Sequence, residues 1–213
     1  VFVFSAPIHA NERAPSFEIP RSHVHTIYSS KLDRTYDLYV KTPPGYGSKR
    51  NAGQTYPAVY LNDGPYTFQV ASGVTRLPTY AGKFQPSLLI GISFAHGDNG
   101  MASRVRDLTQ VKDSDFKRYE TGGGPAYLTF IEDEVIPFIE TEYRANPKER
   151  TLAGQSLGGS FGAFALLTKP YLFSSYILTS PSLWLSDRQI FDLESAYAAK
   201  HEDLKARVYF ATG

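Results

Sequence analysis

The run Gly154-Gln155-Ser156-Leu157-Gly158, with Gly159 after it, constrains the fold of this 213-residue chain more than any other feature. Residues 150–153 before the run have the pattern of a short strand, and residues 159–167 have the small and apolar composition of a helix. A serine between a strand and a helix lies on a tight turn, and flanking glycines leave room for strained backbone and close packing. The sequence therefore predicts a strand, a sharp turn that exposes the Ser156 hydroxyl, and a helix.

This arrangement is typical of the turn that carries the nucleophile in serine hydrolases of α/β architecture. The N-terminus of the following helix also places backbone N–H groups where an oxyanion would form. The five-residue pattern alone can arise by chance in a chain with 17 glycines, so a structural glycine-rich turn is the alternative. The strand before Ser156 and the helix after it favour the nucleophile.

Composition excludes several other classes of function. The formal net charge is +1 and we find no charge runs, so nothing predicts a nucleic-acid or membrane-surface partner. The chain has no cysteine, which excludes disulfides, thiolate metal sites and a cysteine nucleophile. Five scattered histidines without an H-E-x-x-H pattern give no sign of a zinc hydrolase, and we predict neither a metal nor a cofactor.

The first residues, 1–20, are expected to form an N-terminal arm or the remnant of a signal peptide. They begin Val1-Phe2-Val3-Phe4 without a methionine and continue to a candidate cleavage site near Ala10. A periplasmic or secreted location is the preferred prediction, and a cytoplasmic one is the alternative. No segment is long enough to span a bilayer.

Strands and helices alternate along residues 21–213, which predicts one α/β domain with a mostly parallel sheet and helices on both faces. The first two strands are expected to form a hairpin, and residues 95–124 a long irregular segment. The chain stops directly after its last predicted strand, so we expect the C-terminal part of this domain to be missing. Strands are expected at residues 23–28, 36–41, 58–61, 88–94, 150–153, 175–179 and 206–211, and helices at residues 66–75, 125–143, 159–167 and 188–200.

Several motifs together resemble the esterase D-like branch of the α/β-hydrolases, and most closely the siderophore (enterochelin/salmochelin) esterases and their relatives. The motifs are Asn62-Asp63-Gly64 after a strand, Arg104-Val105-Arg106-Asp107-Leu108-Thr109, Val135-Ile136-Pro137-Phe138-Ile139-Glu140, Glu149 to Gly159, and Ser180-Pro181-Ser182-Leu183-Trp184. The resemblance covers residues 20–213 and implies an α/β-hydrolase fold. It also implies that the protein hydrolyses a small-molecule carboxylic ester through an acyl-enzyme on Ser156. Siderophore-type esters are candidate substrates.

The catalytic acid and base are not expected within this chain. In α/β-hydrolases they follow the nucleophile, and the only histidine after Ser156 is His201, at the end of a helix on the opposite edge of the sheet. The resemblance places both groups beyond Gly213. His96 is the one rival, because it follows a strand at the correct edge, although it precedes Ser156. It is predicted either to contact substrate or to face solvent.

The oxyanion hole is expected to use the backbone N–H of Leu157, the residue after the nucleophile. In relatives the second N–H comes from the residue after Asp-Gly, but here that residue is Pro65, which has none. Tyr66 or Gly64 is expected to substitute. If neither does, catalysis is weakened.

Substrate contacts are predicted from Arg104, Arg106 and Trp184, which all follow strand ends at the active edge. Arginine suits bidentate recognition of oxygen atoms, and we favour Arg106 for this role. Salt bridges that anchor the loop, for example to Asp107, are the alternative. Trp184 is predicted to wall the acyl or aromatic part of the site, and packing under the loop is its alternative.

Two other functions stay open at this stage. A non-catalytic binding protein on the same fold is favoured by Pro65 and by the absent histidine. An acyltransferase would use the same acyl-enzyme with an acceptor other than water. The oligomeric state does not follow from the sequence.

Overall fold

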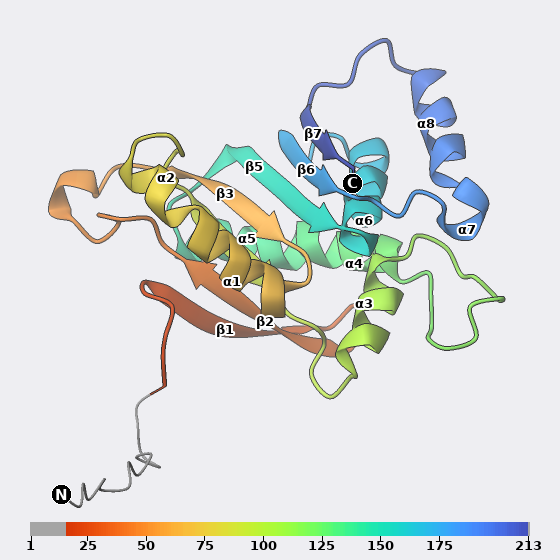
Figure 1. The fold of residues 1–213 in the computed structure, drawn as a ribbon, viewed down its shortest axis with the longest axis horizontal. Coiled ribbons are helices and arrows are strands. Elements are labelled where there is room, and N and C mark those ends of the chain that lie inside the picture. The colour runs from red at the N-terminus through yellow and green to blue at the C-terminus, as the bar shows by residue number, and fades with distance from the viewer. Residues whose placement is uncertain (1–15, 213) are drawn as a thin grey trace, which may run out of the picture.

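A seven-stranded sheet forms the centre of the computed structural model, which describes residues 16–212 (Figure 1). The strands lie in the order β1-β2-β4-β3-β5-β6-β7. Their bounds are β1 (Ser22–Ser29), β2 (Arg34–Lys41), β3 (Tyr56–Leu61), β4 (Leu88–Ile92), β5 (Ala145–Gln155), β6 (Ser175–Thr179) and β7 (Arg207–Ala211). The predicted α/β fold with a mostly parallel sheet is confirmed.

Strand direction determines where functional loops gather. The hairpin β1–β2 is antiparallel and joins β4 in antiparallel orientation, whereas β4, β3, β5, β6 and β7 are mutually parallel. The C-terminal ends of these five strands therefore meet at one edge of the sheet, which we call the C-terminal edge. In α/β sheets this is the edge where ligands bind.

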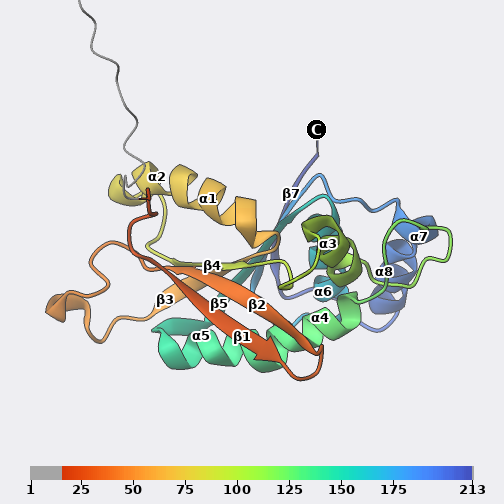
Figure 2. The same ribbon diagram turned by 90° about the horizontal axis from the view of Figure 1, so that it is seen from below.

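Helices cover both faces of the sheet (Figure 2). Helices α1 (Gly64–Val74) and α2 (Arg76–Tyr80) lie on one face, and α1 packs against β4. Helices α4 (Gly124–Phe130), α5 (Ile136–Glu142) and α6 (Leu157–Thr168) lie on the other, where α6 packs against β5 and β6. Large aromatic side chains fill the core on this side, among them Tyr36, Tyr60, Phe130, Phe161 and Phe173.

The segment predicted to be irregular contains a helix, α3 (Gly100–Leu108). The side chain of Asn99 caps it by accepting a hydrogen bond from the Met101 N–H. Its buried face includes Ser103, Arg106 and Asp107, whose polar groups bond to one another. Because three of the five buried residues of α3 are polar, the apolar periodicity that normally indicates a helix is weakened, and the prediction of an irregular segment was wrong here.

The long amphipathic helix predicted over residues 125–143 is present but not uniform. It consists of α4, a π-helical turn η2 (Ile131–Val135), and α5. The π turn ends directly before the helical turn that contains Pro137, a residue that cannot donate a backbone hydrogen bond within the helix. Leu128, Ile131 and Val135 are buried as the pattern predicted.

The last predicted helix begins later than expected. Ser186, Asp187 and Arg188 all have positive φ, within the short element α7 (Leu185–Arg188), so the regular helix α8 spans Ile190–Ala198. It packs on α6. A single-turn 3₁₀ helix η1 (Lys49–Asn51) completes the elements.

Within residues 16–212 no helix is long and apolar enough to cross a membrane. Most of the predicted arm or signal-peptide remnant, residues 1–15, lies outside the described residues, so the predicted location stays a prediction.

Candidate active site

Ser156 lies at the C-terminal edge on the sharp turn between β5 and α6. Its backbone has φ 56° and ψ −115°, a conformation that non-glycine residues rarely adopt. Such a conformation costs on the order of 1–3 kcal/mol and persists only where the surrounding structure imposes it. Ser156 is only partly buried, so its hydroxyl remains reachable.

The glycines around Ser156 stand where neighbouring atoms leave little room for a Cβ. A Cβ on Gly154 would lie 2.2 Å from the carbonyl oxygen of Gly158, and one on Gly159 would lie 2.9 Å from the Cβ of Pro181. A Cβ on Gly158 would lie 3.3 Å from the Cβ of Asn62. Neighbouring atoms therefore crowd all three positions, which explains the glycine pattern that the sequence shows.

The loop after β6 is joined directly to the turn. The Oγ atoms of Ser182 and Ser156 are 3.1 Å apart, and the Ser182 N–H donates to the carbonyl of Ser156 at 3.1 Å. Ser182 is buried, whereas Trp184 two residues later is 70% exposed. Trp184 thus lies near the site without being packed under the loop, which disfavours the packing alternative.

The loop after β3 reaches the turn from the other side. Asp63 adopts left-handed backbone, with φ 58°, and its buried carboxylate accepts hydrogen bonds from Arg104 Nε at 2.8 Å and from the Tyr66 hydroxyl at 2.9 Å. Arg104 also donates to the carbonyl of Gln155 at 3.4 Å. Burial, followed by the charge of Asp63, raises the pKa of Tyr66 above its usual value, so the phenol keeps its proton. Arg104 consequently connects the loop after β3 to the turn that carries Ser156.

The backbone N–H groups of Leu157 and Gly64, the first residues of α6 and α1, are among those at this edge that donate no hydrogen bond to any described residue. The N–H of Tyr66, by contrast, donates to the carbonyl of Asp63 at 3.2 Å. Of the two predicted substitutes for the N–H that Pro65 lacks, Gly64 is therefore the better candidate.

Arg106 occupies a different place from Arg104. It is buried, and its guanidinium donates to Asp107 at 2.8 and 3.0 Å and to Asp98. Asp107 also accepts from Ser103 and from the Tyr36 hydroxyl. These contacts favour the anchoring alternative, and we correct our preference: the guanidinium of Arg106 is occupied by carboxylates of its own loop and helix.

His96 has its partners away from Ser156. Its backbone N–H donates to the carbonyl of Thr35, and its ring Nε2 lies 3.0 Å from a carboxylate oxygen of Asp37 on β2. In the sheet, β2 and β5 are separated by β4 and β3. The half-exposed ring thus fits the solvent-facing alternative better than a substrate contact.

Two of the remaining described histidines, His25 and His201, have partners other than Ser156. His25 bonds to the Tyr143 hydroxyl at 2.6 Å, and His201 stacks on Tyr197 with ring centroids 4.3 Å apart. Neither residue is therefore a candidate base, and the expectation that acid and base follow Gly213 stays a prediction.

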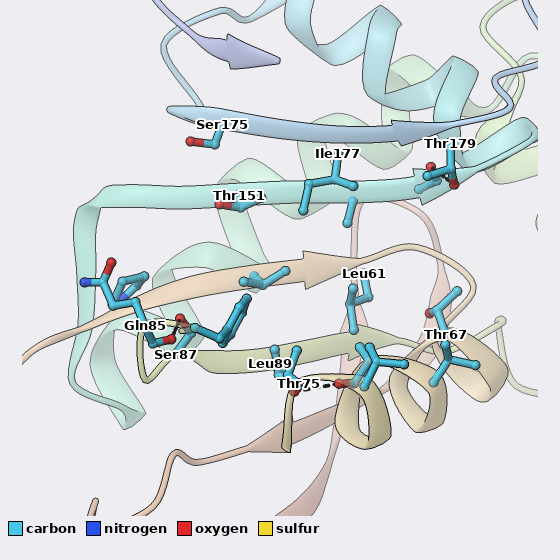
Figure 3. A pocket seen from close by; sticks show the side chains of 18 of the residues that line it. Leu61, Thr67, Thr75, Gln85, Ser87, Leu89, Thr151, Ser175, Ile177 and Thr179 are labelled. Carbon is cyan, nitrogen blue, oxygen red and sulfur yellow. Dashed lines mark hydrogen bonds between the residues drawn. The ribbon is translucent and has the colours of Figure 1, made fainter. Parts of the chain in front are cut away.

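A groove of about 580 Å³ lies on the α1 face of the sheet, where side chains of β3, β5 and β6 point into it together with those of α1 (Figure 3). Its floor is apolar, with Leu61, Leu89 and Ile177 among the side chains drawn. It reaches Gln155 and Thr179 at the C-terminal edge, but Ser156 does not line it. The groove is therefore distinct from the immediate surroundings of Ser156.

Comparison with known proteins places the chain in a family. Residues 29–210 match the Esterase family, described as "Putative esterase". The chain belongs to this family. It is 31% identical to ferri-bacillibactin esterase BesA of Bacillus subtilis over 180 residues, and 31% identical to a siderophore enterobactin esterase of Emericella nidulans over 176 residues. These alignments cover 79% and 76% of this chain, and 61% and 58% of the two relatives, so the chain spans about three-fifths of their length.

Solved structures agree with this assignment. The BES protein of Bacillus cereus has the same fold, with a TM-score of 0.82, 23% identity, and coverage of 96% of this chain and 79% of that chain. The siderophore hydrolase EstA of Aspergillus nidulans gives a TM-score of 0.76 at 26% identity, covering 95% and 74% of the two chains. The resemblance to siderophore esterases predicted from the motifs is confirmed.

Sequence reasoning did not assign roles to Ser182 and Asp63, although both stand in motifs that it quoted. The signal that could have found Ser182 is topological. Because β6 pairs with β5 in parallel, the residues that follow β6 must lie beside the turn that follows β5. For Asp63, the same argument applies to β3, the other neighbour of β5.

Proposed function

We propose that this member of the Esterase family is a serine hydrolase that cleaves carboxylic esters through an acyl-enzyme on Ser156. The observation that carries the proposal is the backbone of Ser156, held at φ 56° between a strand and the N-terminus of a helix. Strained backbone conformations of this kind cluster at functional sites, where the surrounding structure imposes them.

In the first step the Oγ of Ser156 attacks the ester carbonyl, and its proton passes through a base to the departing alcohol. Water then attacks the acyl-enzyme, which releases the acid and restores the hydroxyl. A serine hydroxyl needs such a base, and we expect one in the full-length protein outside the residues described here. The residues at the C-terminal edge supply the nucleophile and the groups that stabilise charge.

We assign the oxyanion hole to the N–H groups of Leu157 and Gly64. Both open a helix, so the helix dipole adds to their attraction for a negative oxygen. The αL backbone of Asp63, held by Arg104 and Tyr66, fixes the direction of the following Gly64 peptide. This arrangement would compensate for Pro65, whose missing N–H otherwise favours a non-catalytic binding protein.

The substrate class that we propose is a siderophore-type ester. The support comes from the relatives, whose names include esterases of ferri-bacillibactin, enterobactin and triacetylfusarinine C. The exposed indole of Trp184 near Ser156 offers a flat apolar surface suited to an aromatic acyl group.

The test compares the full-length protein with its Ser156→Ala variant on p-nitrophenyl acetate and on enterobactin. We expect hydrolysis of both esters by the wild type, and a loss on the order of 10⁴–10⁶ in rate in the variant. Binding of enterobactin without hydrolysis would support the binding-protein alternative. Transfer of the acyl group to an added alcohol in preference to water would support an acyltransferase.

A further inference from the structure

We propose that Ser182 is a second catalytic hydroxyl, which donates a hydrogen bond to the Oγ of Ser156 whenever that oxygen carries negative charge. The inference rests on the proposed function, because it concerns how Ser156 is activated. The observation behind it is the Oγ–Oγ distance of 3.1 Å between Ser182 and Ser156.

The hydroxyl of Ser182 has no other partner among residues 16–212. It lies on a residue that is only 8% exposed, and Ser156 Oγ provides its single side-chain hydrogen bond in the described structure. Burying a hydroxyl without a hydrogen-bond partner costs free energy. The side-chain conformation that bonds the Ser182 hydroxyl to Ser156 Oγ is therefore favoured. Either oxygen can be the donor at rest, because hydroxyl hydrogens rotate.

The backbone fixes this pair independently of the side chains. The N–H of Ser156 donates to the carbonyl of Thr179, and the N–H of Ser182 donates back to the carbonyl of Ser156, at 3.0 and 3.1 Å. Between them, Ser180 has φ 41° and donates its N–H to Ala211 on β7. Pro181 is pressed against Gly159, where any Cβ would lie 2.9 Å away. The loop after β6 is thus built to hold residue 182 beside the nucleophile.

The chemical role follows from what each oxygen can donate. When the base removes the Ser156 proton, the Oγ of Ser156 has only lone pairs, and Ser182 becomes the necessary donor of the pair. The bond from Ser156 Oγ to the acyl carbon then forms and the bond from that carbon to the leaving alcohol breaks. Ser182 keeps its proton throughout. Its hydrogen bond strengthens as charge develops on Ser156, and the same benefit recurs when Ser156 leaves during deacylation.

The experiment measures the second-order rate at which a fluorophosphonate probe labels Ser156 in the full-length protein, together with kcat and KM for p-nitrophenyl acetate. In Ser182→Ala we expect labelling and kcat to fall about 10- to 100-fold, with KM changed by less than about 2-fold. Ser160→Ala is the matched control. Ser160 is a buried serine of α6 whose hydroxyl has no partner among the described residues, so its removal should leave both rates at the wild-type level.

Ser182→Thr and Ser182→Cys complete the series. The threonine restores the donor and should recover much of the rate, and the cysteine, which has similar shape but a weak donor, should remain slow. The proposal is overturned if folded Ser182→Ala or Ser182→Cys labels at the wild-type rate, or if the loss appears in KM alone. Should the alanine variant fail to fold, the cysteine variant decides. A wild-type protein that hydrolyses esters without labelling at Ser156 would instead contradict the proposed function.

Discussion

Two arginines on one helix, two residues apart, stand in two different polar regions of this protein. Arg104 belongs to the region around Ser156, which we call the nucleophile region: Ser156, Ser182, Asp63, Arg104 and Tyr66. Arg106 belongs to the α3 anchor, which comprises Arg106, Asp98, Ser103, Asp107 and Tyr36. Both regions contain a buried aspartate that pairs with an arginine.

The regions differ in how completely their polar groups are satisfied. In the α3 anchor, Asp107 accepts from three side chains, and the guanidinium of Arg106 is used by two carboxylates. In the nucleophile region, the hydroxyls of Ser156 and Ser182 make side-chain hydrogen bonds only to each other among the described residues. The adjoining N–H groups of Leu157 and Gly64, which begin α6 and α1, donate to no described residue. Positive φ also occurs at Asp63 and Ser156, and at Ser180 in the loop that carries Ser182. Backbone strain and unused polar groups, rather than charge, distinguish the proposed reactive site from the α3 anchor.

The largest effect on stability is expected from Arg106→Met. Removing the guanidinium leaves Asp107 buried without its cation, and burial already raises the pKa of this carboxyl against the opposing hydrogen bond from Arg106. We expect the free energy of unfolding to fall by about 3–5 kcal/mol, as when one partner of a buried ion pair is removed. Urea unfolding measures this.

Arg118→Met, at an exposed arginine of the following loop, is the control and should change stability by less than about 0.5 kcal/mol. If Arg106→Met keeps the wild-type stability but raises KM, then Arg106 contacts substrate and the comparison between the two arginines fails.

A smaller loss of stability, combined with a loss of activity, is expected from Arg104→Met. Asp63 keeps the hydrogen bond from Tyr66, so we expect a cost of about 1–3 kcal/mol. The loop that carries Gly64 loses its link to the turn at Gln155, and kcat per folded molecule should fall about 10-fold. Ester hydrolysis normalised to the folded fraction measures this. An unchanged kcat would show that Arg104, like Arg106, only anchors α3.

The smallest effect is expected far from both regions, at Glu132 in the π turn. Hydrogen bonds from Lys169 and then Tyr171 lower the pKa of Glu132 below its usual value of 4.5. The carboxylate therefore contributes stability at neutral pH, which is lost as the pH falls through the folded-state pKa. Glu132→Gln should cost at most about 1 kcal/mol at pH 7, because the pair is partly exposed. The variant should also lose less of its free energy of unfolding than the wild type as the pH falls into the acidic range. An unchanged pH dependence of unfolding would contradict this prediction.

The turn at Ser156 could be predicted from sequence because its requirements are local. Gly154 meets the carbonyl oxygen of Gly158 within the turn, and strand and helix patterns flank it, whereas the contacts of Gly158 and Gly159 with Asn62 and Pro181 depend on the fold. The roles of Arg104 and Arg106 could not be predicted in the same way. Both residues share one motif, and only the fold reveals that Asp63 faces one and Asp98 faces the other.

Helix α3 was missed for a related reason. Three of its five buried residues, Ser103, Arg106 and Asp107, are polar groups that bond to one another, so buried positions of α3 do not stand out as apolar in the sequence. Ser182 was overlooked as a site residue because its relation to Ser156 depends on the parallel pairing of β5 and β6. Local sequence patterns thus do not reveal those contacts of the candidate site that depend on the order and pairing of the strands.

The central claim is that the strained turn presents Ser156 as a nucleophile, and one measurement tests it most directly. The full-length protein is incubated with a fluorophosphonate, digested, and the modified residue is located by mass spectrometry. We expect a single adduct on the peptide that contains Ser156, appearing in step with the loss of ester hydrolysis. An adduct on another residue, or an inactivated enzyme with Ser156 unmodified, would contradict the account.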